Sequence, residues 1–187
     1  MYKNLKRDLQ AVISINEAEF NTVINKTKCI QLEKNETWKP EGKISQELAY
    51  VNKGLLRHFY MDNGNEKTEK FYIERSWIGD IGSFLSKTPS LRNYIAIEKT
   101  ELVVLSFSEL QKLYNSFPKM ERFGRLYVEN LLIEQQNRSR SFKLDSAETR
   151  YAKFKVEFPI LQQRIPQYLI AQYIGITSES LSRIRKP

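Results

Sequence analysis

The stretch Pro166-Gln-Tyr-Leu-Ile-Ala-Gln-Tyr-Ile-Gly-Ile-Thr-Ser-Glu-Ser-Leu-Ser-Arg183 decides the fold of the C-terminal part of this chain. Proline suits the first turn of a helix, and the apolar residues that follow it recur at three- and four-residue steps. Gly175 supplies the left-handed residue that ends a helix, and Thr177 or Ser178 can cap a second one. The stretch therefore predicts two helices joined by a short turn.

The second helix is expected to turn Leu181 and Ile184 inward and to leave polar residues exposed. In a helix-turn-helix this helix enters the DNA major groove, where a carboxylate accepts from cytosine N4 and arginine donates to guanine O6 and N7. The alternative is an ordinary helical hairpin, in which Glu179 and Arg183 form only a solvated ion pair. The outward residues are Ser178, Glu179, Ser182, Arg183 and Lys186.

The placement of charge favours the DNA-binding alternative. Residues 143–187 carry eight Lys or Arg side chains against four Asp or Glu, and the whole chain has a formal charge of +8. A basic excess suits polyanions, because neutralising phosphates releases condensed counterions. No apolar run is long enough to span a membrane, and the N-terminus lacks the apolar stretch of a secretory signal, so we expect a cytoplasmic protein without a membrane partner.

A long helix is predicted to begin at Pro118. Its apolar residues form a narrow stripe with three- to four-residue spacing. From periodicity alone, this stripe is either a seam against a partner helix or the buried face of a surface helix. The stripe consists of Met120, Phe123, Tyr127 and Leu131.

Capping and periodicity predict further helices on both sides of the long one. Residues 1–39 contain apolar residues at helical spacing and predict two short helices that cap the following sheet. A short helix is expected around Leu110 to Tyr114. Asp145 and Glu148 have the spacing of a capping box, which predicts a helix from Ser146 to about Phe158.

Between about Gly42 and Phe107 the pattern changes to short apolar, aromatic or β-branched runs. Asn-Lys-Gly at 52–54 and Asp-Asn-Gly-Asn at 62–65 are turn sequences, because glycine and asparagine accept the positive φ of tight hairpins. We therefore expect antiparallel strands that close into a roll or barrel. The runs are Leu48–Val51, Leu55–Tyr60, Lys70–Ile73, Tyr94–Ile97 and Leu102–Phe107.

Cys29 and His58 are the single residues of their types, and this limits the chemistry of the chain. One cysteine forms no internal disulfide and cannot supply a thiolate zinc site or an iron–sulfur cluster. A metal-dependent β-barrel enzyme needs several converging His and carboxylate ligands. We therefore expect no metal site and no enzyme activity, and a solvated or hydrogen-bonded side chain for His58.

Several stretches, in the order of the family, resemble the Crp/Fnr transcription regulators. Residues 166–183 resemble the family's helix-turn-helix, and the match extends over roughly Gly42 to Arg185. The helix before the helix-turn-helix and successive pieces of the cyclic-nucleotide-binding β-roll are matched by Ser146–Tyr151, Val51–Arg57, Gly79–Phe84 and Ala96–Leu102. The resemblance implies an α+β fold, with an antiparallel β-roll of the jelly-roll type, flanking helices, a long dimerisation helix and a winged helix-turn-helix.

This resemblance implies a domain order and a function. The expected domains are a β-roll sensor with its N-terminal helices at 1–117, a dimerisation helix at 118–142 and a DNA-binding domain at 143–187. The function would be that of a homodimeric, sequence-specific regulator on a pseudo-palindromic double-stranded operator, with RNA polymerase as a further candidate partner. The alternative is a β-roll sensor that acts through protein partners with a degenerate DNA-binding module. Only two residues follow Arg185, which leaves no sequence for the β-hairpin wing of many relatives, so either this branch lacks the wing or the sequence stops short of it.

The resemblance also assigns roles to residues. Glu179 and Arg183 take the places of the family's base-reading residues, and Ser178 that of the serine at the helix start. It favours a dimer seam for the stripe on the long helix.

In nucleotide-binding members, a glycine and a glutamate at a short helix start hold the ribose and phosphate, and an arginine with a small hydroxyl residue neutralises the phosphate. The corresponding residues here are Gly79, Asp80, Arg92 and Asn93, after a segment about two residues longer than usual. Because this pattern is altered, a cyclic nucleotide is a candidate effector, alongside an unknown ligand or none.

Overall fold

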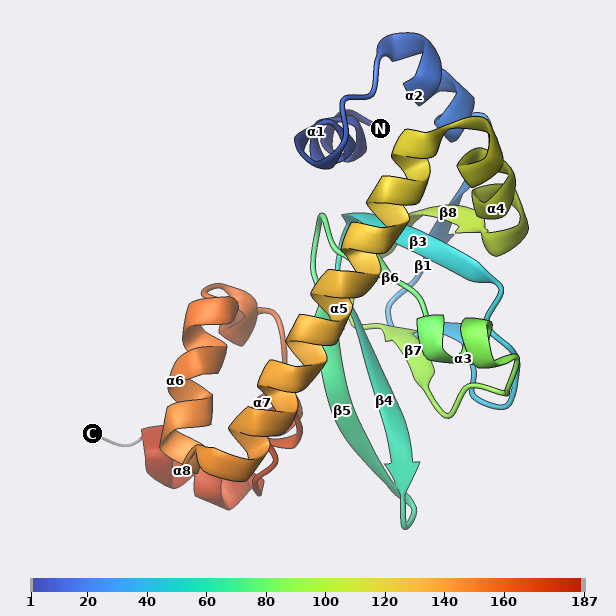
Figure 1. Cartoon of the computed structure of the whole chain (residues 1–187). Coiled ribbons are helices and arrows are strands. Elements are labelled where there is room, and N and C mark those ends of the chain that lie inside the picture. The colour runs from blue at the N-terminus through green and yellow to red at the C-terminus, as the bar shows by residue number, and fades with distance from the viewer. Residues whose placement is uncertain (1, 186–187) are drawn as a thin grey trace.

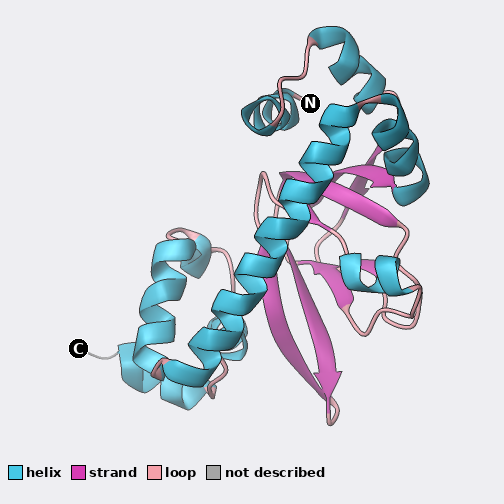
Figure 2. Cartoon of the chain, in the orientation of Figure 1, coloured by secondary structure: helices cyan, strands magenta, loops and turns pink. Residues whose placement is uncertain are grey.

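The structure is a computed structural model that describes residues 2–185, and it combines two antiparallel sheets with helices before, between and after them (Figures 1 and 2). The helices are α1 (Lys3–Val12), α2 (Glu17–Ile24), α3 (Ile81–Ser86), α4 (Phe107–Ser116), α5 (Pro118–Leu144), α6 (Ala147–Glu157), α7 (Gln167–Ile174) and α8 (Ser178–Arg185). The strands are β1 (Thr27–Leu32), β2 (Thr37–Lys39), β3 (Glu47–Lys53), β4 (Leu56–Asp62), β5 (Asn65–Tyr72), β6 (Trp77–Ile78), β7 (Asn93–Ala96) and β8 (Thr100–Ser106).

The strands form a roll of two four-stranded sheets, in the orders β1-β8-β3-β6 and β2-β7-β4-β5. Alternate residues of both sheets point into a shared apolar core, which includes Val51, Leu56 and Leu102. The β4–β5 hairpin turns at Asn63 and Gly64, with φ of +49° and +78°, as the sequence predicts for a tight turn. The expected α+β fold with an antiparallel roll is confirmed.

The sheet begins earlier in the chain than the sequence indicated. Two short helices are confirmed, but they end at Ile24, and β1 and β2 follow within the segment 1–39 that we expected to be helical. The strand β1 is an edge strand that pairs with β8 from Thr27↔Leu105 to Leu32↔Thr100. Most of its side chains stay in contact with solvent, so it lacks the apolar alternation that would have marked it as a strand.

A second core lies outside the roll, where helices cover one sheet. Leu5 and Leu9 of α1 pack with Tyr50 of β3 and with the first turns of α5. Asn16 caps α2 through a capping box with Glu19. The N-terminal helices therefore cap the sheet as predicted, and they fill the end of the roll from which α5 starts (Figure 1).

The boundary between α5 and α6 lies one to two residues beyond the expected one. The helix α5 continues to Leu144, two residues past the expected end, and Asp145 is its last-turn cap, with its N–H donating to Ser141 O. Ser146, not Asp145, caps α6, because its hydroxyl accepts from Thr149 N at 3.2 Å. The Asp145 carboxylate accepts from Lys153 Nζ at 2.6 Å instead.

A third core joins the C-terminal helices to the roll. Leu55 and Phe71 of the roll are buried among residues of α6, α7 and α8. The ring centroid of Phe71 lies 5.4 Å from that of Tyr173, 6.2 Å from that of Phe158 and 6.5 Å from that of Phe154. The C-terminal helices therefore share one apolar cluster with β5.

We expect Phe71→Ala to lower the free energy of unfolding by about 3–5 kcal/mol, because it removes a fully buried ring and leaves a cavity. Denaturant unfolding measures this change. Val156→Ala, at a side chain that is 83% exposed, serves as the control and should change stability by less than about 0.5 kcal/mol. Equal effects of the two substitutions would contradict the shared core.

Candidate functional site

The two helices α7 and α8 are joined by a turn that only glycine fits. Gly175 ends α7 with φ of +73°, and the N–H groups of Gly175 and Ile176 donate to Gln172 O and Ala171 O at 3.1 and 3.0 Å. A Cβ on Gly175 would lie 2.6 Å from Cε1 of Phe142 on α5. Both the left-handed backbone and the phenylalanine ring therefore require glycine here.

Two arginines hold the last carbonyls of α7. Arg138 of α5 donates to Tyr173 O at 3.0 Å, and Arg150 of α6 donates to Ile174 O at 2.7 Å. A helix C-terminus leaves its last carbonyls without helical partners, and cationic donors are favoured there. No local sequence pattern predicts this role, because both arginines lie far from Gly175 in the chain. Hydrogen bonds from α5 and α6 thus stabilise the C-terminal end of α7, where the turn to α8 begins.

The helix α8 presents the predicted face. Thr177 caps it, since its hydroxyl accepts from Ser180 N at 3.2 Å, and Leu181 is fully buried beneath it, with Ile184 half-buried. Glu179 and Arg183 form no ion pair within the described part of the chain. Lys186 lies outside the described residues. Those exposed together are Ser178, Glu179, Ser182 and Arg183.

The helix α7 is docked on β5 of the roll (Figure 1). Thr68 of β5 donates to Gln172 Oε1 at 2.7 Å. Before α7, the Arg164 guanidinium bonds both carboxylate oxygens of Glu74 at 2.9 Å and Glu98 Oε1 at 2.6 Å. The helix α7 and the segment before it are therefore held by direct contacts to β5 and to the loops of the roll that carry Glu74 and Glu98.

The roll holds an open cavity of about 470 Å³ beside α3. Asp80 caps α3 and is 5% exposed, with Oδ1 accepting from Ser83 N at 3.1 Å and Oδ2 from Ser90 Oγ at 2.7 Å. Gly79 lies where a Cβ would stand 3.1 Å from Leu48 Cδ1. Gly79 is therefore required for close packing against Leu48. Both oxygens of the Asp80 carboxylate already accept hydrogen bonds from the chain itself.

Arg92 lies in the wall of this cavity and is held by two carboxylates. Its Nε donates to Glu69 Oε2 at 2.9 Å, and its Nη1 lies 3.4 Å from Asp80 Oδ1. Burial opposes the charge of Arg92, but the hydrogen bond to Glu69 and the negative charges of Glu69 and Asp80 together outweigh burial and raise the pKa of the guanidinium. Asn93 pairs instead with Glu41 at 3.1 Å. The structure brings Asp80 and Arg92 together and turns Asn93 elsewhere.

His58 is buried, and it is hydrogen-bonded as expected. Its Nε2 lies 2.9 Å from Glu69 Oε2 and its Nδ1 lies 2.9 Å from the Tyr72 hydroxyl. Because a carboxylate only accepts, Nε2 carries the proton and Nδ1 accepts from Tyr72. Burial lowers the pKa of His58 and so favours the neutral ring. No cluster of three or more potential metal-ligating side chains exists among the described residues.

Three of the four residues of the expected dimer seam on α5 pack against the core of the chain itself. Met120 and Phe123 are 2% and 4% exposed and belong to the core beneath the N-terminal helices. Tyr127 packs against the same core and its hydroxyl approaches Trp77 O at 3.5 Å. The stripe is thus the buried face of a surface helix, the other of the two alternatives, and only Leu131 lies beyond the roll core.

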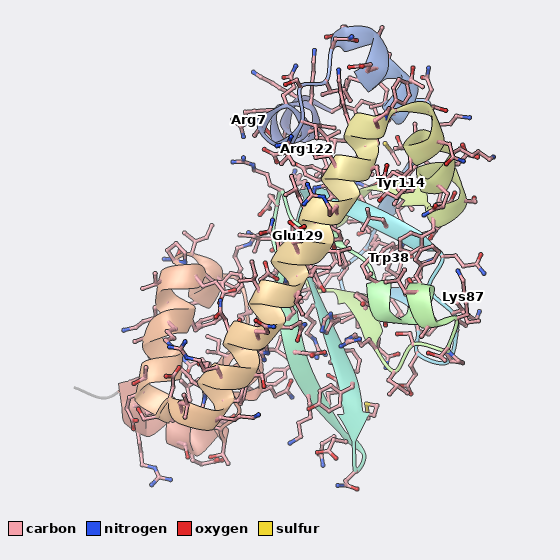
Figure 3. All side chains as sticks on the ribbon, in the orientation of Figure 1. Arg7, Trp38, Lys87, Tyr114, Arg122 and Glu129 are labelled. Atoms are coloured by element: carbon pink, nitrogen blue, oxygen red, sulfur yellow. The ribbon has the colours of Figure 1, made fainter. Side chains whose placement is uncertain are left out.

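The opposite side of α5 faces away from the sheets, as Figure 3 shows for Arg122 and Glu129. Arg125 and Glu129 form an ion pair of 2.6 Å along it. Three large apolar side chains are exposed close together near the middle of the helix: Val128 at 42%, Leu132 at 59% and Ile133 at 54%.

Comparison with known structures shows what this architecture resembles. CLP, the c-di-GMP responsive global regulator of Xanthomonas campestris, superposes with a TM-score of 0.72 at 13% identity, covering 90% of this chain and 89% of its own. A regulator from Eubacterium rectale assigned to the crp/fnr family superposes with a TM-score of 0.69 at 16% identity, covering 91% and 82%. The chain has the Crp/Fnr regulator fold.

CooA of Carboxydothermus hydrogenoformans shares this regulator fold with a TM-score of 0.71 at 15% identity, covering 94% of this chain and 81% of its own. No protein-family model matches the chain, and no curated protein matches it in sequence. Within residues 2–185, no helix has both the length and the apolar character needed to cross a membrane.

We expect Gly175→Ala to destabilise the two-helix unit more than Gly64→Ala destabilises the hairpin. Both residues have positive φ, which costs a residue with a Cβ about 1–2 kcal/mol. Only at Gly175 must the Phe142 ring also move, since a Cβ at Gly64 meets nothing within 4 Å. Chemical denaturation of both variants measures the difference.

A double variant, Phe142→Ala with Gly175→Ala, isolates the clash. It should show a smaller destabilisation than the two single substitutions added together, because the second change no longer displaces a ring. Strict additivity would argue against the contact between the turn and α5.

Proposed function

We propose that this chain is a sequence-specific DNA-binding transcription regulator that acts as a homodimer in the cytoplasm and has no catalytic activity. The observation that supports it most is α8, a capped helix with one buried face, whose opposite face exposes Glu179 and Arg183 without an ion pair between them. A helix held rigidly by its neighbours can present such side chains to a major groove.

In this proposal Arg183 donates two hydrogen bonds to a guanine, and Glu179 accepts one from a cytosine. Ser178 and Ser182 lie on the same exposed face and can reach the phosphates or base edges beside them. Lys186, beyond the described residues, would add a phosphate contact. The residues from 143 onward form the DNA-binding module, 118–142 the dimerisation helix and 1–117 the sensor. RNA polymerase is the partner that an activating regulator would contact.

The dimer interface in this proposal is the outward side of α5. Val128, Leu132 and Ile133 expose apolar surface along about a turn and a half of helix, which an equivalent helix from a second copy would cover. Two-fold symmetry then places two copies of α8 on a pseudo-palindromic operator, with half-sites about 34 Å apart.

The roll would be the sensor, and the cavity beside α3 would hold an effector. Arg92 is already bonded to Glu69 and close to Asp80. An anionic group of a cyclic nucleotide therefore has no vacant guanidinium to bind in this conformation. We assign no resident cofactor to the chain.

Selection from a randomised duplex pool at two salt concentrations tests the proposal. An enriched pseudo-palindrome whose binding survives the higher salt is the expected result. Weak, salt-sensitive and sequence-independent binding would leave only the +8 charge as its cause, and the chain would then act through protein partners.

We expect Arg183→Ala to weaken binding to the selected operator by about 1–3 kcal/mol, roughly 5- to 150-fold, and to relax the sequence preference at one position of each half-site. Fluorescence anisotropy with operator variants measures both effects. Arg7→Ala is the matched control, because Arg7 is an exposed arginine on α1 at the far end of the molecule from α8 (Figure 3). Unchanged binding by the Arg183 variant would refute this assignment.

We expect Leu132→Asp to convert the dimer to monomer, because it buries a charge at the centre of the proposed interface. Sedimentation equilibrium gives the oligomeric state. Leu85→Asp is the control, since Leu85 on α3 is comparably exposed, 66% against 59%, and lies outside the interface. A dimer that persists in the Leu132 variant would place the interface on another surface.

A further inference from the structure

Glu69 occupies an irregular position in β5. His58 pairs with Lys70 and Phe59 pairs with Thr68, so Glu69 is the extra residue of a β-bulge. A bulge leaves one residue outside the ladder and redirects its side chain. Here the bulge turns the Glu69 carboxylate toward Arg92 and His58, each with a donor nitrogen 2.9 Å from Oε2.

Glu69 also separates two cavities. It lines the cavity of the roll together with Asp80, Ser90 and Arg92. It lines a second cavity of about 470 Å³, whose other walls come from α5, α6 and α7 and include Arg138, Glu157 and Tyr173. A movement of this side chain therefore changes the walls of both the sensor and the space beside the DNA-binding helices.

The charges around Glu69 explain why the roll cavity lacks a vacant anion site. Burial acts to raise the pKa of Glu69, but hydrogen bonds from His58 and Arg92 outweigh it and hold that pKa well below its usual range. Among the described residues that line the cavity, Arg92 is the single cationic side chain, and burial favours the neutral form of His58. One guanidinium thus faces the carboxylates of Glu69 and Asp80, and an added phosphate would be repelled unless Glu69 withdraws.

The same strand carries the contacts that orient α7. Thr68, next to Glu69, donates to Gln172 Oε1, and Phe71, two residues beyond it, is buried among the aromatic rings of α6 and α7. If Glu69 leaves Arg92 and the bulge relaxes, the register of Thr68 and Phe71 against α7 must change. Interfaces of this kind adopt discrete arrangements because packed cores do not deform continuously.

We propose that Glu69 is an autoinhibitory counter-ion, which occupies Arg92 in place of the phosphate group of an effector and, through the β5 bulge, holds α7 in its docked position. This inference rests on the proposed function, which it deepens by naming the regulation of the sensor site. A phosphate-bearing ligand binds better to the state in which Glu69 has released Arg92. Such a ligand therefore shifts the population toward the released state, to an extent set by the ratio of its affinities for the released and the paired states.

Glu69→Gln in the full-length protein tests the first half of the proposal. The amide keeps the size of the side chain and removes its charge. Calorimetric titration with inorganic phosphate and, separately, with cyclic AMP should show at least about tenfold tighter binding than by the unsubstituted protein. Adding Arg92→Ala should abolish that gain. A gain with cyclic AMP alone would identify a nucleotide phosphate as the ligand, and a gain with both probes would identify the phosphate group itself.

Glu66→Gln is the matched control, because Glu66 lies on the same strand and pairs with the Arg57 guanidinium, but does not line either cavity. It should bind both probes as the unsubstituted protein does. Equal binding by the Glu69 and Glu66 variants, or a gain that persists without Arg92, would overturn the proposal.

Hydrogen exchange of the amides in β5 and α7 tests the second half. Exchange in 167–174 should rise when the Glu69 variant binds either probe and stay unchanged in the Glu66 variant. Tighter probe binding without any change in exchange would refute the coupling to α7. If the Glu69 variant does not fold, the unsubstituted protein at phosphate concentrations that saturate Arg92 provides the same readout, and unaltered exchange there would likewise refute it.

These measurements need no DNA. Failure of the operator selection would therefore overturn the proposed function and leave the result on Glu69 and Arg92 intact.

Discussion

The structure depends most on the burial of Phe71, a roll residue, among the aromatic rings of the C-terminal helices. A small three-helix unit buries a limited apolar area by itself, and here Leu55 and Phe71 complete its core. The roll and the C-terminal helices are therefore packed against each other through a shared core, in addition to being joined by the chain. A displacement of β5 therefore also displaces α7, because Gln172 of α7 accepts a hydrogen bond from Thr68 of this strand.

The helix α5 contacts the N-terminal helices at its start and the C-terminal helices near its end, so different parts of its surface pack against different cores. Its first turns close the core under α1 and α2 with Met120 and Phe123, while Arg138 and Phe142 near its C-terminal end support the turn at Gly175. A face committed to the chain's own core is not available to a second copy. The apolar residues left for association are those on the outward side, around Leu132.

The features that the sequence predicts correctly are those whose determining residues lie close together in the chain. The helix pair at 166–183 carries its proline, glycine and apolar spacing within 18 residues, and the hairpin at 62–65 carries its turn residues, so both were found. The strand β1 was missed because its pairing with β8 is long-range and its side chains are mostly exposed. The spacing of the apolar stripe on α5 is the same whether the stripe packs against a partner helix or against the chain's own core. Only the fold shows that Met120 is covered by the chain's own core.

The charges of the cavity beside α3 show the same limit of local sequence patterns. Asp80 and Arg92 stand where the resemblance to the Crp/Fnr family placed effector contacts, and the cavity is present. The residue that decides its chemistry is Glu69, which no local motif marks, because it reaches the site through a bulge. A guanidinium enclosed by carboxylates is stabilised without a ligand, so a phosphate must replace an existing ion pair rather than fill a vacancy. Under the proposed function, an effector phosphate would compete with Glu69 for Arg92, and the response would depend on the difference between the affinities of Arg92 for these two anions.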